Sequence, residues 1–195
     1  MSIIKVDGES WKWYNLDVLG GGMMSEFEIK DSSITKAMLV DKDYLSDDTK
    51  ASVNNSDIVL LPFERFRESE VRCFACESID FYKYVKQKQE GLSITFLENK
   101  NEVKTITLHS LDIWMPLILI VMEQQNQLAI VLNLISSFIY DKYKGLLKKE
   151  PANVHLDIIV EDKNSRKSKK ISFVGPVEVF QEKFKQIDIN KIMGE

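Results

Sequence analysis

The chain has 195 residues, a formal net charge of -4, 44% hydrophobic residues and 29% charged residues. This composition is typical of a folded globular protein and excludes general disorder, which requires low hydrophobicity and high net charge. The mild negative charge gives no global attraction to nucleic acid or anionic lipid, so any basic patch has to be local.

The N-terminal part predicts only short elements. Residues 11–18, with Trp11 and Trp13, suggest a short early strand or an extended segment, and Gly20–Gly22 suggests a flexible turn. Residues 26–29 and 37–40 are further candidate strands. The polar stretch 41–55 predicts a loop or a short helix.

The next part of the chain gives clearer patterns. The apolar run Ile58–Leu61 predicts a buried strand, and residues 77–90 predict a helix with one apolar face. Apolar and polar residues alternate over 92–97 and again over 103–108, which predicts two strands that pair as a hairpin. Residues 57–110 are therefore expected to form a β-α-β-β block.

Residues 112–148 are helical in character, and 128–147 is apolar nearly all round, which predicts a long buried helix. The polar run 123–127 interrupts the apolar stretch, so no membrane span is expected. Alternation over 154–160 and 170–174 predicts two strands, and 177–187 predicts an amphipathic helix.

The whole pattern predicts an α+β fold: a mixed sheet with the β-α-β-β block, the long buried apolar helix and a C-terminal β-β-α unit. We divide the chain into an N-terminal α+β domain, 1–112, and a C-terminal region, 113–195, or read both as one continuous domain. The polar N-terminus and the presence of only two cysteines predict a cytoplasmic protein.

The sequence Cys73-Phe74-Ala75-Cys76, just before a predicted helix, is the first candidate for chemistry. A helix N-terminus lowers the pKa of a thiol, and the spacing suits two zinc ligands. The alternative is a pair of reduced, semi-buried thiols, because no second Cys pair follows. Cys73 and Cys76 are therefore candidate metal or redox residues only.

A basic run near the predicted turn at 161–167 is the second candidate. A basic hairpin tip can contact phosphates or an acidic partner, although no aromatic residues are interleaved for base stacking. The alternative is solvated loop charge. The candidate binding residues are Lys163, Arg166, Lys167, Lys169 and Lys170.

Other polar groups suggest no catalytic site. The carboxylate pairs Asp47–Asp48 and Glu161–Asp162 are interpreted as solvated loop charges, and neither His109 nor His155 lies in a motif. The aromatic stretch 11–14 fits an interface anchor or the core of a strand equally well. No catalytic residue and no cofactor is expected.

The sequence N-L-I-S-S-F-I-Y-D-K-Y-K-G at residues 133–145, followed by the β-β-α tail at 154–187, resembles a segment of uncharacterised bacterial proteins from conflict or anti-phage gene clusters. The resemblance covers about the last third of the chain. It implies a role in antiviral defence and no mechanism, because that family offers no catalytic residues to transfer.

We therefore expect a non-enzymatic accessory subunit of a bacterial defence system, which binds another protein subunit or self-associates into an oligomer. Two alternatives remain: a redox- or metal-responsive protein that uses Cys73 and Cys76, and a nucleic-acid-binding module that uses the basic tip at 163–170.

Overall fold

The computed structural model describes residues 2–7, 10–15, 25–63, 71–107, 112–123, 125–145 and 152–185, with the backbone alone for those before residue 16 and for Gln125, Gln181, Lys183 and Lys185. Its elements in chain order are β1 (Ser2–Asp7), β2 (Ser10–Asn15), β3 (Glu26–Ser32), α1 (Lys36–Val40), α2 (Asp47–Asn54), β4 (Ile58–Leu61), β5 (Phe74–Ala75), α3 (Cys76–Lys88), β6 (Ile94–Phe96), β7 (Thr105–Ile106), β8 (Ile113–Trp114), β9 (Leu117–Met122), α4 (Gln125–Gly145), β10 (Asn153–Asp162), β11 (Ser168–Pro176) and α5 (Val177–Lys185).

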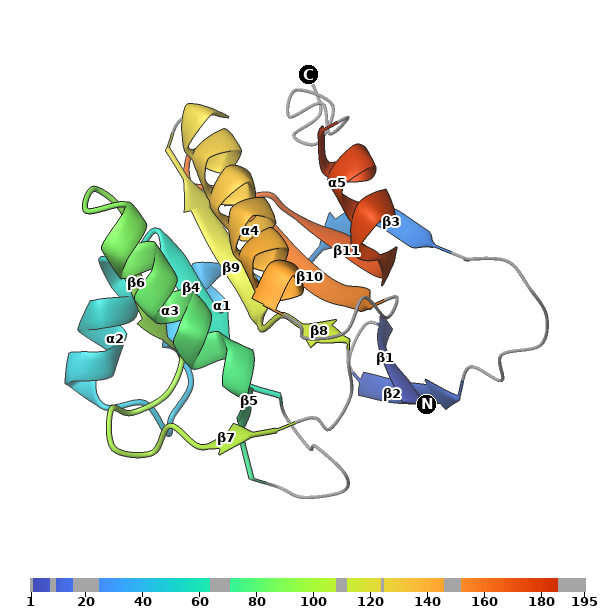
Figure 1. Ribbon diagram of the computed structural model, residues 1–195. Helices are drawn as coiled ribbons and strands as arrows, with labels where there is room; N and C mark the ends of the chain where they lie inside the picture. Colours follow the sequence, from blue (N-terminus) through green and yellow to red (C-terminus); the bar gives the residue numbers. More distant parts are fainter. Residues whose placement is uncertain are drawn as a thin grey trace.

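One seven-stranded mixed sheet organises the fold, in the order β3-β11-β10-β9-β4-β6, with β8 pairing with the start of β10 (Figure 1). β9 and β10 are parallel and are connected through α4, and β4 and β6 are parallel and antiparallel to β9. The predicted α+β fold with a mixed sheet is confirmed. Strands from before and after residue 112 share this sheet.

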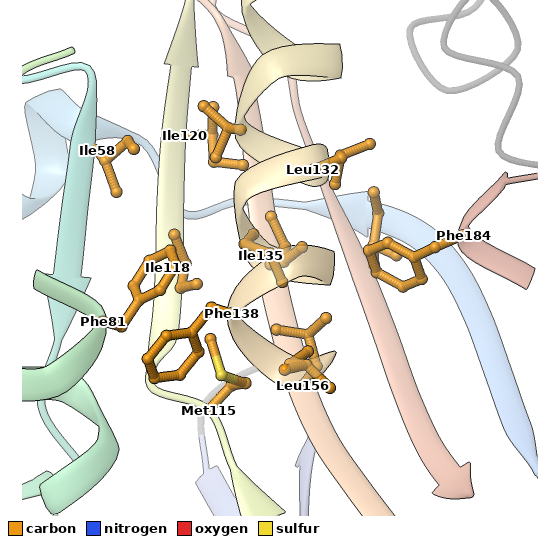
Figure 2. Close-up of a cluster of buried hydrophobic side chains, with 14 of the residues drawn as sticks. Ile58, Phe81, Met115, Ile118, Ile120, Leu132, Ile135, Phe138, Leu156 and Phe184 are labelled. Atoms are coloured by element: carbon orange, nitrogen blue, oxygen red, sulfur yellow. The ribbon is translucent and has the colours of Figure 1, made fainter. Parts of the chain in front are cut away.

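β9 lies at the centre of the sheet, and all six of its residues are buried. Side chains of a strand alternate between its two faces. Ile118 and Ile120 belong to the core on the face that α3, α4 and α5 cover, which we call the α4 face. Leu117 and Leu119 belong to a second core under α1 and α2, on the α1 face. Figure 2 shows part of the α4-face core, where the rings of Phe81 and Phe138 meet with centroids 5.3 Å apart.

The expectation of a helix from residue 112 onward is wrong over its first part. Ile113–Trp114 and Leu117–Met122 are strands, and the helix begins only at Gln125. A short apolar run fits a buried helix or a strand buried on both faces equally well, and the sheet here uses it as the central strand. Pro116 lies between β8 and β9, and it has no backbone N–H to donate to a neighbouring strand.

α4 confirms the long helix, but it is not buried all round. It packs one face on the sheet through Leu128, Ile135 and Phe138, and it exposes Ile130 and Tyr140 on the opposite side. A helix that covers one face of a sheet needs only one apolar stripe. The other exposed residues of α4 are mostly polar, among them Asn126, Asn133 and Ser137.

Two predicted strands in the N-terminal half also differ. Residues 37–40 lie in α1, where the Thr35 hydroxyl accepts a hydrogen bond from the backbone N–H of Met38 at 3.4 Å and caps the helix. β7 does not pair with β6 as a hairpin but runs parallel to β5 in a separate two-stranded sheet. The strands predicted at 26–29, 58–61 and 92–97 and the helix at 77–90 are confirmed with small shifts of their ends.

The C-terminal β-β-α unit is confirmed as β10, β11 and α5. It does not stand alone, because β10 pairs with β9, and Phe180 and Phe184 of α5 join the α4-face core. The early strand is confirmed as β2, which pairs with β1 in a separate hairpin. The predicted turn at Gly20–Gly22 and the side chains of residues 11–14 lie outside the described residues.

In the described part of the chain, no helix has both the length and the apolar character needed to cross a bilayer.

Substituting Gly175 with alanine tests the packing of β11 against the start of β3. A Cβ at Gly175 would lie 2.8 Å from Ser25 Cβ and 3.1 Å from Ser25 Cα, so the backbone would have to move. We expect Gly175→Ala to lower the free energy of unfolding by about 1–3 kcal/mol, measured by urea denaturation.

Gly145→Ala is the matched control, because a Cβ there meets nothing within 4 Å. It should leave the free energy of unfolding unchanged or slightly higher, since alanine favours a helix. Equal stability of the two variants would show that the close approach of Ser25 and Gly175 does not constrain the sheet.

Candidate functional site

The two cysteines lie where the sequence predicts, next to the start of a helix. Cys73 is buried and its backbone pairs with that of Phe63, while Cys76 is the first residue of α3. Burial raises the pKa of the Cys73 thiol. Burial also raises the pKa of Cys76, with a further contribution from its hydrogen bond to Glu77 Oε2 at 3.1 Å. Neither thiol thus has the lowered pKa that is expected at a helix N-terminus.

The described residues also contain no group of three His, Cys, Asp or Glu side chains arranged to hold a metal ion. Cys73 and Cys76 therefore have no third or fourth protein ligand of these types within that part of the chain.

The basic residues near the hairpin tip are not gathered into one patch. Lys163 pairs with Glu123, and Lys169 lies 4.0 Å from Asp31. Lys170 is on β11 instead of the tip and is buried, with its ammonium 2.9 Å from Asp157. Arg166 and Lys167 at the tip itself are exposed. Most of the positive charge thus faces carboxylates, which weakens the attraction that a phosphate would feel.

A buried cluster around His155 was not singled out from the sequence. His155 is only 8% exposed, and its ring stacks on Trp114 with centroids 3.7 Å apart. Its Nε2 lies 3.3 Å from Asp112 Oδ2, and Asp112 also accepts the backbone N–H of Asn153 at 3.0 Å. The parallel pairing of β8 with β10 puts these side chains together.

Electrostatics fix the ionisation of Asp112 in this cluster. Burial by itself would raise the pKa of its carboxyl, but the hydrogen bonds from His155 and Asn153 outweigh that effect, and the pKa ends below its usual value. His155 Nδ1 is buried and has no hydrogen-bond partner. That nitrogen is therefore closed off from solvent in this conformation.

An apolar pocket of about 350 Å³ lies on the α1 face, beside α1. Its floor is formed by residues at the ends of three strands: Leu61 of β4, Leu97 just after β6 and Leu117 of β9. Met38 on the wall is 55% exposed. The lining is completed by Ile34, Leu39, Asp41, Lys42 and Pro62.

A buried carboxylate holds α1 in place beside this pocket. Glu161 accepts the backbone N–H of Lys36, the first residue of α1, at 2.5 Å. The Lys36 ammonium donates to the carbonyls of Asn54 and Ser56 at the end of α2. Burial lowers the pKa of Lys36. The interpretation of Glu161 as a solvated loop charge is therefore wrong, because it is a buried residue of β10.

No local signal in the sequence marks the pocket or the His155 cluster. Both depend on which strands become neighbours, and the residues that form them are separated by long stretches of chain. The only local sign was Thr35, a good N-cap residue three positions before Met38.

The chain matches no protein-family model, no curated protein and no solved structure. The resemblance to defence-cluster proteins therefore remains a prediction from the sequence.

The thiols provide one test of this description. Because both thiol pKa values are raised, we expect Cys73 and Cys76 to react more slowly with a disulfide reagent at pH 7 in the folded protein than in urea. The single variants Cys73→Ser and Cys76→Ser assign each rate. A thiol that reacted faster in the folded state would restore the redox hypothesis.

Asp112→Asn tests the buried cluster. The amide has one acceptor oxygen in place of two, and its NH₂ would meet the donors that Asp112 now accepts, so we expect a loss of about 1–3 kcal/mol at pH 7. Because the folded pKa of Asp112 is depressed, the wild-type advantage is present above the unfolded value of about 3.9 and is lost as pH falls through the folded pKa.

Urea denaturation of the wild type and of Asp112→Asn at pH 7 and at pH values below about 4 measures the loss of stability at pH 7 and its disappearance at low pH. Asp80→Asn, which removes the exposed ion pair with Lys142, is the control and should change stability little at either pH. A deficit in Asp112→Asn that stayed constant down to the lowest pH would contradict this account of the cluster.

Proposed function

We propose that this chain is a non-enzymatic interaction subunit that binds another protein by taking an apolar side chain of that protein into the pocket beside α1. The observation that carries the proposal is the combination of a buried apolar floor with an exposed Met38 at the pocket wall. The resemblance in residues 133–145 favours a role in a bacterial defence system.

The lining favours an apolar group and disfavours a polar small molecule. Small-molecule sites use a few placed polar groups to fix the orientation of the ligand. Of the nine lining residues only Asp41 and Lys42 are polar; Asp41 is exposed and Lys42 half-buried. The floor is formed by Leu61, Leu97 and Leu117, so burial of an apolar group against it is favourable, whereas a polar group would find no hydrogen-bonding side chain there.

The size of the pocket and the nature of its wall favour a protein as the partner. A volume of about 350 Å³ is at the small end for a ligand site and holds one or two side chains. Methionine is unbranched and adapts to differently shaped apolar groups, which suits a binding surface. Glu161 and Lys36 hold α1 against the sheet, so the wall that carries Met38 is set before binding.

The alternative functions have less support. Cys73 and Cys76 have raised thiol pKa values, and Lys163, Lys169 and Lys170 face carboxylates. The raised thiol pKa values do not favour redox chemistry at the two cysteines. The carboxylates beside the three lysines do not favour phosphate binding at the hairpin tip.

Met38→Glu tests the proposal. A tagged chain is purified from the organism that encodes it, after nuclease treatment and at about physiological salt, because phosphate contacts can otherwise imitate a partner. We expect the wild type to bring down one protein in stoichiometric amount, and Met38→Glu to bring down about tenfold less or lower still, since a carboxylate at the wall opposes burial of an apolar group.

Two further variants make the test specific. Ile130→Glu places the same charge on an exposed apolar residue of α4 and should retain the partner. Met38→Leu keeps the apolar wall and should also retain it. Retention of the partner by Met38→Glu, or equal loss in Met38→Glu and Ile130→Glu, would exclude the pocket as the binding site.

A further inference from the structure

β3 is an end strand of the main sheet, and in the described part of the chain it pairs with β11 alone. It spans seven residues, Glu26–Ser32, in sequence E-F-E-I-K-D-S. The outer edge of such a strand presents backbone N–H and C=O groups that can pair with another strand, and charged side chains normally oppose such pairing. The positions of the charged residues on β3 therefore determine which strand can pair with its outer edge.

The register with β11 assigns each side chain of β3 to a face. Ile29 lies opposite Ile171, on the α4 face, and yet Ile29 is 39% exposed. Glu28 lies opposite Ser172 and Lys30 opposite Lys170, on the α1 face. The side chains of Glu28 and Lys30 are 45% and 34% exposed. The strand thus carries one exposed apolar residue between two half-exposed residues of opposite charge.

This arrangement is complementary to itself. We infer that β3 pairs with β3 of a second copy of this chain, antiparallel and about a two-fold axis at Ile29, so that one sheet continues through both copies. In this register Glu28 of each copy faces Lys30 of the other, Ile29 faces Ile29, Glu26 faces Ser32, and Phe27 faces Asp31. Opposite charges in directly facing positions stabilise a strand pair.

Neighbouring registers place like charges together. A two-fold axis that relates antiparallel strands within one sheet pairs residues on the same face, so the next possible centres are Glu28 and Lys30. The first places two Glu28 carboxylates opposite each other, although it also places Glu26 of each copy opposite Lys30 of the other, and the second places two Lys30 ammonium groups opposite each other. Like charges in facing positions destabilise a strand pair, and among these three registers only the one centred on Ile29 has Glu–Lys pairs and no pair of like charges.

The neighbouring strand places a second lysine opposite Lys30. Lys30 and Lys170 face each other across β3 and β11, which is an unfavourable pair of like charges. Asp157 lies 2.9 Å from Lys170, and Glu28 lies 3.4 Å from Lys30. In the proposed dimer, Glu28 of the second copy would place another carboxylate beside Lys30, on the side of β3 that faces away from Lys170.

The contact is small, and this determines how it has to be measured. One strand pair buries well under the roughly 1,200 Å² typical of stable complexes, so the dimer should dissociate on dilution. We measure the weight-average mass by sedimentation equilibrium of the full chain from about 1 to 200 μM at about 50 mM salt. The wild type is expected to rise from the monomer mass toward twice that mass.

Charge exchange tests the register. Glu28→Lys alone and Lys30→Glu alone each place like charges opposite one another, and each should remain monomeric where the wild type dimerises. An equimolar mixture of the two restores two Glu–Lys pairs and should dimerise. The double variant Glu28→Lys/Lys30→Glu should dimerise like the wild type. Circular dichroism confirms that each variant is folded.

Two controls separate this pairing from other effects. Glu26→Lys makes the same change of net charge on the same strand but faces Ser32, so it should still dimerise. Met38→Glu alters the pocket and should leave the mass unchanged, so the dimer and the proposed partner site succeed or fail separately. A wild type that stays monomeric at every concentration, or a dimer unaffected by Glu28→Lys, would overturn the inference.

Discussion

The burial of β9 on both of its faces is the constraint on which the rest of this fold depends. Its six residues, L-I-L-I-V-M, offer no polar side chain to either side, so each face of the sheet has to be covered where β9 runs. α4 covers one face, and α1 and α2 cover the other. The pocket beside α1 is a consequence of this second layer. Because α1 is only five residues long, it does not cover Leu117 at the start of β9 completely, and Leu117 lines the pocket.

The sheet changes character on the α1 face between β9 and β10. On β9 that face carries Leu117, Leu119 and Val121, whereas on β10 it carries His155, Asp157 and Glu161 beside the single apolar Ile159. Each of these three polar side chains has a partner: Asp157 pairs with Lys170, His155 Nε2 with Asp112, and Glu161 with the first backbone N–H of α1, while His155 Nδ1 has none. α1 is thus anchored at the boundary between the apolar and the polar half of the face.

What could be predicted from the sequence is what depends on neighbouring residues. The alternation of β10 and the apolar run of β4 are local signals, and both strands are where the sequence placed them. Residues 117–122 were expected to be helical because a six-residue apolar run carries no period that separates a buried helix from a strand buried on both faces. The stacking of Trp114 on His155 and the convergence of Leu61, Leu97 and Leu117 require the order and register of strands, which no local pattern contains.

The position of β3 has a consequence for the order in which the chain can fold. Its only partner among the described strands is β11, and the Ser168 hydroxyl donates to the carbonyl of Ser32 across 136 residues of sequence. On a ribosome, β3 emerges before β11, and among the described strands it has none to join until the 136 residues that separate Ser32 from Ser168 have been made. Closing so long a loop is slow, since the entropy is lost before the contacts form. During that interval both edges of β3 are unpaired, and charged side chains such as those of β3 are a common protection of an unpaired strand.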